Sequence, residues 1–408
     1  MIEWFAIIIP IAVAIVLFLY YKHKVTWWEL ILPIASTVLF ILVFKLLMKT
    51  VMITDNEYWG SLVVEARYYE SWETWVVKRC SKQVACGHYY SGTGKNRTRH
   101  TKYCTEYYDC SYCDNTSAKW VAYDDAGNSF SISENYYNSL IKKWGVTPEF
   151  VELNRSIRKH FGCGKDGDMY SIKWNKDQLK SEAAVTTHSY TNKVQASHSA
   201  FKLPHISSKE AKKLGLYDYP ETYDYYKQKA VLGADSLFTK KDIEYIEQRF
   251  QYFNGFYGSR CKMKLFLCLF QNKNISITNK QEAYWDGGNQ NELVVCIGMD
   301  KNKNIEWVKP FSWTDDKRIM VDIREDISEI GRFDTDKIYN AIENAIKHDS
   351  HVYKNFKKDF NYLHVDLPTW SIILIYVLTA IITGLVSWWC LINEHNQESY
   401  ERDNGKRH

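Results

Sequence analysis

Three apolar runs stand near the ends of this sequence, and a long polar region separates the second from the third. They cover residues 4–21, 30–48 and 371–392. A bilayer core of about 30 Å needs roughly 20 apolar residues as a helix, and each run comes close to that length. Only helices and closed barrels satisfy the backbone in lipid, so the pattern predicts three transmembrane helices. The first two follow each other directly and form a helical hairpin.

The polar region predicts a β-rich α+β structure outside the membrane. The complete fold class is therefore a membrane protein with an N-terminal helical hairpin, one C-terminal span and this extramembrane region. The expected units are the following: a transmembrane hairpin (1–50), an antiparallel β domain rich in Cys and aromatics (55–175), a connecting region with short helices (176–257), an α/β domain (258–350), the third transmembrane helix (368–392) and a polar tail (393–408).

Alternating patterns predict strands at 58–78, 77–86 and 102–113, with a polar loop at 91–98. In an antiparallel hairpin, the residue numbers of two facing residues always add up to the same total. Cys80 with Cys110 and Cys86 with Cys104 both give 190, which places both pairs in one register and on one face. Directly opposed residues lie close enough for disulfides. Cys163 is then the natural partner of Cys113.

Zinc is the alternative for the same stretch, because histidines stand among its cysteines. Two Cys pairs six residues apart along a strand are separated by about 20 Å and cannot reach one tetrahedral ion. A site of Cys110 and Cys113 with His88 or His100 survives that objection. Cys261, Cys268 and Cys296 lie in apolar runs and are expected to be small core residues.

The cysteines decide on which side of the membrane the polar middle region is expected to lie. Lysines and arginines flank the spans almost evenly, so the positive-inside rule is close to a tie. Disulfides persist in oxidising compartments, and the disulfide interpretation therefore places the middle region on the extracytoplasmic side. The zinc alternative would instead place the middle region on the cytoplasmic side. Lys45 is the only charged residue within the runs, near a span end where it can reach the interface. Anchoring is favoured over transport.

Further elements follow from period and turn chemistry. The β domain should contain a hairpin at 119–133, with helices at 134–143 and 148–159. A capping box at Ser207 and Glu210 predicts a short helix ending at Gly215, and another helix is expected at 241–252. Strands are expected at 262–270, 293–299, 305–309 and 318–323, followed by an amphipathic helix at 334–347.

This last part, a sheet with an amphipathic helix followed by a tether to a membrane span, resembles the membrane-tethered TPM modules in layout. The resemblance covers less than a quarter of the chain and rests on no diagnostic motif. It implies an α/β fold for this part and carries over no site residue.

Candidate chemistry is sparse. Trp285, Asp286 and Asn289 precede a strand in a Gly-containing loop and could line a pocket, together with Asp315 and Asp316 as acid/base groups. The stretch from Cys163 to Asp168 is a solvated turn or a Ca²⁺ loop without the full EF-hand spacing. His188, His198 and His205 have no spacing that places them on one face, and the charges at 324–326 are typical of a solvated face. No nucleophile elbow, P-loop or zinc-protease motif is present.

Composition narrows the function only in part. Net charge is +4 without a long Lys/Arg block, so no nucleic-acid partner is expected. Tyr and Trp number 30 and 15, typical of β-rich structure and of surfaces that grip a partner through flat rings. We therefore expect a protein embedded in a lipid bilayer that binds a protein or envelope component, at a cell or viral envelope. The alternatives are a membrane-tethered hydrolase with its site in the α/β domain and a cytoplasm-facing zinc protein. No cofactor is expected outside the zinc alternative.

Overall fold

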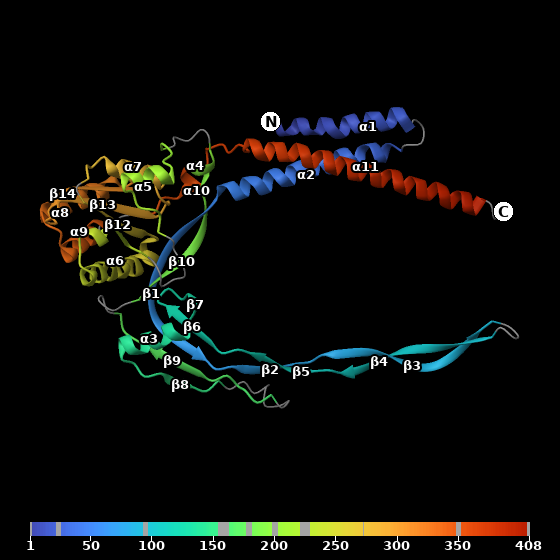
Figure 1. The fold of residues 1–408 in the computed structure, drawn as a ribbon, viewed down its shortest axis with the longest axis horizontal. Coiled ribbons are helices and arrows are strands. Elements are labelled where there is room, and N and C mark those ends of the chain that lie inside the picture. Colours follow the sequence, from blue (N-terminus) through green and yellow to red (C-terminus); the bar gives the residue numbers. More distant parts are fainter. Residues whose placement is uncertain are drawn as a thin grey trace.

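The computed structural model describes residues 2–21, 26–92, 97–153, 163–176, 182–197, 203–220, 229–271, 273–347 and 352–405, without the side chains of 21, 347 and 393–405. Within these ranges the chain forms a three-helix bundle, a β domain with a long ribbon, and an α/β domain (Figure 1). The bundle and the ribbon both extend away from the two domains.

The apolar runs form helices. Their elements are η1 (Ile2–Ile7) with α1 (Ile8–Tyr21), α2 (Trp27–Ile53) and α11 (Thr369–Gly405). The segments long and apolar enough to cross a membrane are Ile2–Tyr20, Trp27–Ile53 and Thr369–Ile392. Ala6, Ile41 and Ile375 pack together at the centre of the bundle. Lys45 forms an ion pair with Glu3 of η1 rather than extending freely to the interface.

The β domain is a six-stranded antiparallel sheet in the order β7-β6-β1-β9-β8, with β10 also paired to β1. Its elements are β1 (Thr54–Tyr69), β6 (Lys119–Asp124), β7 (Ser129–Ile132), β8 (Glu149–Val151), β9 (Met169–Lys173), β10 (Glu182–Thr191) and α3 (Glu134–Trp144). Strand β1 follows α2 directly. Its first half pairs with β10, and its second half lies between β6 and β9. The predicted hairpin at 119–133 and helix at 134–143 are present.

The prediction of a helix at 148–159 is wrong for the described part of that range, residues 148–153. Residues Glu149–Val151 form β8, paired with β9, and 154–162 lie outside the described residues. An edge strand is favoured here because Phe150 packs across the pair against Tyr170.

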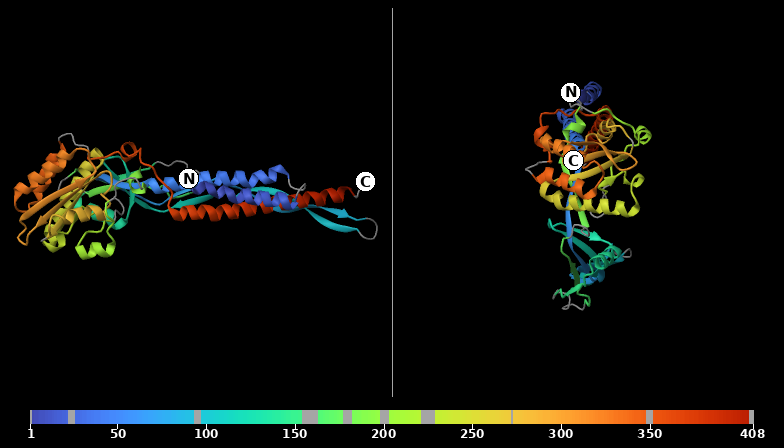
Figure 2. Two further views of the ribbon diagram at one scale, coloured as in Figure 1. Left: turned by 90° about the horizontal axis from the view of Figure 1, so that it is seen from above. Right: turned by 90° about the vertical axis from the view of Figure 1, so that its left-hand side faces the viewer.

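The ribbon consists of two successive antiparallel pairs. They are β2 (Trp72–Val76) with β5 (Tyr112–Thr116), and β3 (Arg79–Ser91) with β4 (Thr98–Asp109). The sequence predicted continuous strands at 58–78 and 77–86. The structure interrupts the chain at 70–71 and 77–78 instead. The ribbon runs in the same direction as the three helices and lies apart from them (Figure 1). The view from above in Figure 2 shows the same common direction.

The disulfides join the cysteine pairs expected from the sequence, but the predicted register is wrong. The pairs are Cys80–Cys110, Cys86–Cys104 and Cys113–Cys163, with Cα–Cα distances of 5.8, 5.6 and 5.8 Å. Cys80 faces Tyr108 and Cys104 faces Val84, so the first two disulfides connect diagonal neighbours. A bulge at Cys86 separates the two halves of the ladder, and bulges are not visible in an alternating pattern.

The α/β domain contains a four-stranded sheet in the order β11-β12-β13-β14, in which only the last pair is antiparallel. Its strands are β11 (Val231–Leu232), β12 (Lys264–Gln271), β13 (Glu292–Met299) and β14 (Ile305–Ser312). Its helices are α4 (Lys193–Ala196), α5 (Ser208–Leu214), η5 (Ala234–Ser236), α6 (Lys240–Cys261), α7 (Ile277–Tyr284), α8 (Lys317–Ile330), α9 (Thr335–Lys347) and α10 (Phe356–Asp359). Helices α6, α8 and α9 cover one face, and α5 and α7 cover the other.

The strand predicted at 318–323 is wrong, because these residues begin helix α8. Asp316 caps the helix by accepting from the backbone N–H of Arg318, and Ile319, Ile323 and Ile327 form one buried stripe. The capping box at Ser207 and the end at Gly215 are confirmed in α5. Cys268 and Cys296 are buried neighbours on β12 and β13, and Cys261 is half-buried.

The two domains pack through glycines. A Cβ atom on Gly258 of α6 would lie 2.5 Å from the carbonyl oxygen of Gly60 in β1. Helix α6 can therefore lie directly on β1 only because position 258 lacks a side chain, whereas a Cβ atom on Gly60 would meet the carbonyl oxygen of Ala184 in β10 instead. Segment 176–257, expected as a connecting region, contributes β10 to one sheet, and β11 and most of α6 to the other domain.

Candidate functional site

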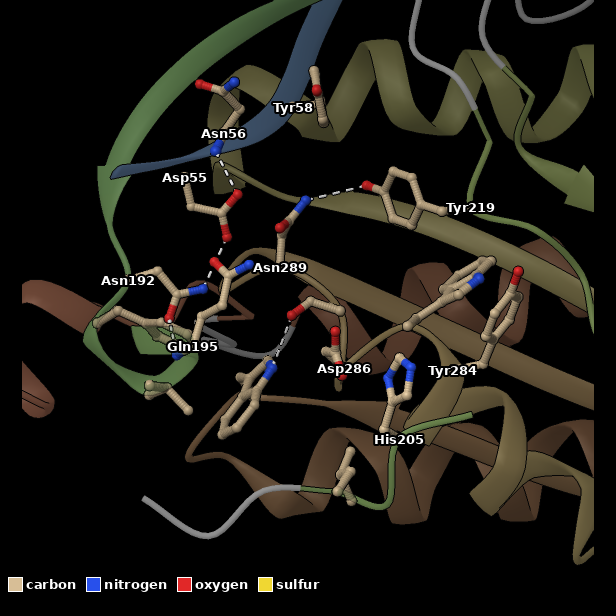
Figure 3. Close-up of a pocket in the computed structure, with 16 residues that line it drawn as sticks. Asp55, Asn56, Tyr58, Asn192, Gln195, His205, Tyr219, Tyr284, Asp286 and Asn289 are labelled. Atoms are coloured by element: carbon tan, nitrogen blue, oxygen red, sulfur yellow. Dashed lines mark hydrogen bonds between the residues drawn. The ribbon is translucent and has the colours of Figure 1, made fainter. Parts of the chain in front are cut away.

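A cavity of about 690 Å³ opens where the α/β domain meets the start of β1 (Figure 3). Its walls come from β1, α4, the segment before α5, the loop after α7, and the segments around Trp313 and Phe356. Strand β1 begins at the end of α2, so the cavity lies where the chain leaves the apolar bundle. This volume is typical of a small-molecule site.

Aromatic side chains form one part of the lining: Tyr58, Tyr219, Tyr284, Trp285, Trp313 and Phe356. Trp285 meets Tyr219 edge to face at 5.2 Å between ring centroids, and Trp313 meets Phe356 in the same way at 5.1 Å. The indole N–H of Trp285 donates to the carbonyl of Tyr217 at 2.8 Å, and that of Trp313 to the carbonyl of Gly288 at 3.0 Å. These bonds fix the indoles in place.

The loop after α7 positions Asp286 through an unusual backbone. Asp286, Gly287 and Gly288 all have positive φ, at 51°, 86° and 76°. A Cβ atom on Gly287 would lie 2.8 Å from the ring of Trp313, so this position needs glycine for both conformation and space. The Asp286 side chain is exposed at the cavity, and no hydrogen bond to it exists among the described residues.

Asp55 lies at the opposite part of the lining and is held firmly. Its Oδ2 accepts from the hydroxyl of Tyr190 at 2.9 Å and from the amide of Asn192 at 2.8 Å, while Oδ1 accepts from the backbone N–H of Asn56 at 2.8 Å. These bonds connect β1, β10 and the cap of α4. Asp55 therefore stabilises the wall of the cavity.

A buried polar network lies behind the cavity, at the start of β13. The Glu292 carboxylate accepts from the Tyr219 hydroxyl and from the backbone N–H of Asn289 at 2.9 Å. Burial raises the pKa of Glu292 and raises that of Tyr219 well above its usual range. Lys264, buried nearby, has its pKa lowered to about 8, mainly by desolvation.

The same network reaches the segments that lead to the apolar helices. Gln290 donates to Glu57 of β1 at 2.8 Å and accepts from the backbone N–H of Phe356 at 2.9 Å. Burial raises the pKa of Glu57 to about 7, although the bond from Gln290 favours the charged form. Gln290 thus ties β13 to both the strand that follows α2 and the segment that precedes α11.

The predicted pocket residues are only partly brought together. Trp285, Asp286 and Asn289 line the cavity. Asp315 is not part of the lining; both its oxygens accept from Lys354 at 2.6 Å. Asp316 is also outside the lining and caps α8. Asp55, Asn192 and Tyr219 were missed, because they lie far from the loop in sequence.

The zinc alternative does not fit the disulfide-bonded form of the ribbon. Cys110 and Cys113 are bonded to Cys80 and Cys163, so neither offers a thiolate. His100 bonds to Ser91 at 2.6 Å. His88 faces Thr101 across the ladder. Glu73, Cys113 and Cys163 also lie within 4.8 Å of one another, but this group contains the same disulfide.

The remaining candidates lie apart. His188 stacks on Trp59 at 3.6 Å, and desolvation lowers its pKa; His205 lines the cavity, and His198 lies outside the described residues. In the turn after Cys163, Asp168 accepts from the backbone N–H of Leu153 at 3.1 Å. Residues 324–326 are exposed on α8.

Comparison with known proteins gives no relative from which a role could be transferred. The chain matches no protein-family model, no curated protein and no solved structure at a significant level.

Proposed function

We propose that this chain is a membrane-anchored binding protein. Its three apolar helices lie in a bilayer, and its disulfide-bonded β region stands on the extracytoplasmic side. There the ribbon presents its surface to an acidic protein partner. Three helices of sufficient length and three disulfides support the anchoring and the side.

The observation that carries the binding role is a set of exposed tyrosines on the ribbon. These are Tyr89, Tyr90, Tyr103, Tyr107, Tyr108 and Tyr112. Each is between 46% and 64% exposed. Tyrosines offer large contact areas with little conformational freedom to lose, and they are enriched at the energetic centres of interfaces. A solvated ribbon gives no reason of its own to collect six of them.

The charge of the ribbon indicates the partner. Between positions 72 and 116, which the ribbon spans, the sequence has seven Lys or Arg residues and four acidic residues. Arg79 lies over the ring of Tyr107 at 5.3 Å, and Lys82 over that of Tyr108 at 5.6 Å. Cations and rings therefore form a mixed surface, complementary to carboxylates beside apolar groups.

Photo-crosslinking tests this proposal. A photoreactive phenylalanine analogue replaces Tyr107 in one variant and Tyr362 in a control. Tyr362 is 78% exposed but lies on the segment before α11, away from the ribbon. In the cells that make the protein, we expect a higher-mass protein adduct from position 107 that weakens at high salt, and none from 362. Equal labelling at both positions, or no adduct from 107, contradicts the proposal.

The hydrolase alternative has less support. Of the three carboxylates it used, only Asp286 lines the cavity.

A further inference from the structure

The cavity lies at the depth of lipid headgroups if α2 spans the bilayer. Helix α2 has 27 residues. At 1.5 Å per residue it is about 40 Å long, whereas the hydrocarbon core is about 30 Å thick. The ends of α2 therefore reach the interfacial region. Asp55 and Asn56 follow Ile53 within three residues, and both line the cavity.

The charges of the lining oppose anionic ligands. Two aspartates, Asp55 and Asp286, line the cavity, and none of its described lining residues is a lysine or arginine. Glu57 and Glu292 lie buried behind the same wall. A phosphate would meet carboxylates, and among the described lining residues only His205 could offer it a positive charge, so phosphorylated ligands fit poorly.

The lining also does not form a cage for a cation. The carboxylate of Asp55 is already engaged by three donors from the protein. Asp286 is the remaining carboxylate of the lining, and His205 is at the same end of the cavity in Figure 3. A metal cation needs several free oxygen ligands, and Asp286 is the one lining carboxylate that no described side chain engages.

Neutral hydrogen-bonding groups and flat rings dominate instead. Asn192, Gln195 and Asn289 bring amides to one end, and Tyr284 lies near Asp286 at the other (Figure 3). Trp285 also lines the cavity, whereas the amide of Asn56 accepts from the hydroxyl of Ser189 in β10. Amides and carboxylates pair with hydroxyl groups. Aromatic faces cover the C–H faces of a sugar ring. This combination suits an uncharged molecule with many hydroxyls and apolar faces.

We propose that this cavity binds an uncharged saccharide of one or two rings, either free or as the headgroup of a glycolipid. Asp286 accepts hydrogen bonds from its hydroxyls, and Tyr284 and Trp285 contact its faces. The site is separate from the tyrosine surface of the ribbon and does not depend on its function.

Saturation-transfer NMR on the full chain tests this proposal. The protein is held in phosphatidylglycerol nanodiscs, which avoids detergents with sugar headgroups. The probes are cellobiose and N,N′-diacetylchitobiose, with glucose 6-phosphate and choline as charged comparators. We expect transfer to at least one disaccharide and to neither comparator.

Two substitutions locate the binding. Asp286→Asn keeps a residue that tolerates positive φ but removes the charge, and we expect it to weaken disaccharide binding by about tenfold. Asp315→Asn changes an exposed carboxylate outside the cavity and should leave the affinity unchanged. Binding of neither disaccharide, preferential binding of a charged probe, or equal affinity in the Asp286 variant overturns the proposal.

A second arm identifies the source of the saccharide. Nanodiscs with digalactosyl diacylglycerol are compared with nanodiscs of phosphatidylglycerol alone. Loss of the disaccharide signal in the glycolipid discs assigns the cavity to a lipid headgroup, and an unchanged signal assigns it to a free saccharide. The glycolipid comparison is interpreted only if a disaccharide binds and Asp286→Asn weakens that binding.

Discussion

Glu57 holds a carboxyl group in a place that water hardly reaches. It is 2% exposed, and its pKa is raised to about 7 from an ordinary value of 4.5. Gln290, its partner, is equally buried and donates through its amide. The folded chain therefore keeps the Glu57 proton between pH 4.5 and 7, where the unfolded chain releases it. The contribution of this group to stability falls as pH rises through that window and is constant above it.

Glu57→Gln removes this dependence. A glutamine oxygen can still accept from Gln290, and the side chain carries no charge at any pH. We expect the free energy of unfolding at pH 8 to increase by about 2 kcal/mol, with little change at pH 4.5. Denaturant unfolding at several pH values measures the difference, with Glu106→Gln on the exposed ribbon as control. A variant that is less stable at pH 8, or that keeps the wild-type slope, contradicts this role of burial.

At the scale of elements, the ribbon contrasts with the sheet of the α/β domain. Strands β12 and β13 are buried almost throughout, whereas β3 and β4 are largely exposed. An isolated two-stranded hairpin is marginally stable in water. The ribbon therefore depends on its disulfides, and the sheet depends on its apolar core.

Removing one disulfide should loosen the ribbon alone. In the double variant Cys86→Ser/Cys104→Ser, a link between positions 18 residues apart is lost. Closure of such a loop is worth about 3 kcal/mol. We expect faster amide hydrogen exchange in β3 and β4, and unchanged protection in β12 and β13. Unchanged exchange in the ribbon would show that its ladder is stable without this link.

The elements were predictable where one local signal dominates. The apolar helices, the cap of α5 and the buried strands β12 and β13 follow from period and turn chemistry. Residues 318–323 were misassigned because Ile319, Val321 and Ile323 alternate as in a strand. The deciding stripe continues to Ile327, beyond that window. The disulfide partners were correct although the register was not, because diagonal neighbours also bring cysteines within bonding distance.

At the scale of the molecule, the candidate site shows the limit of sequence reasoning. The loop from Trp285 to Asn289 has a local signal, its paired glycines. Asp55 and Tyr219 have none, because they reach the cavity only through the packing of β1 and of the segment after α5. Asp315 and Asp316 look like acid/base groups in the sequence, but the structure places both outside the cavity, where Asp315 pairs with Lys354 and Asp316 caps α8.

The direction of the ribbon has a consequence for the membrane. It runs along the same direction as the helices (Figure 1). Its charged side chains and open strand edges cannot lie in hydrocarbon. With the helices across a bilayer, we expect the ribbon to turn away at its base and to stay in water. A water-soluble amine reagent should modify Lys82 and Lys102 as fully in nanodiscs, whose two faces are both open to water, as in detergent. Protection of these lysines by lipid would contradict this arrangement.

The central claim is a membrane-anchored chain whose disulfide-bonded region stands on the oxidising side. Counting thiols tests it most directly. Native membranes are solubilised under argon with a metal chelator, which prevents air oxidation of free thiols, and the protein is denatured and mass-tagged without and with prior reduction. Four cysteines are free in the structure, and the sequence contains ten. We predict four reactive thiols before reduction and ten after it. Ten reactive thiols before reduction would contradict the disulfides and the extracytoplasmic side together.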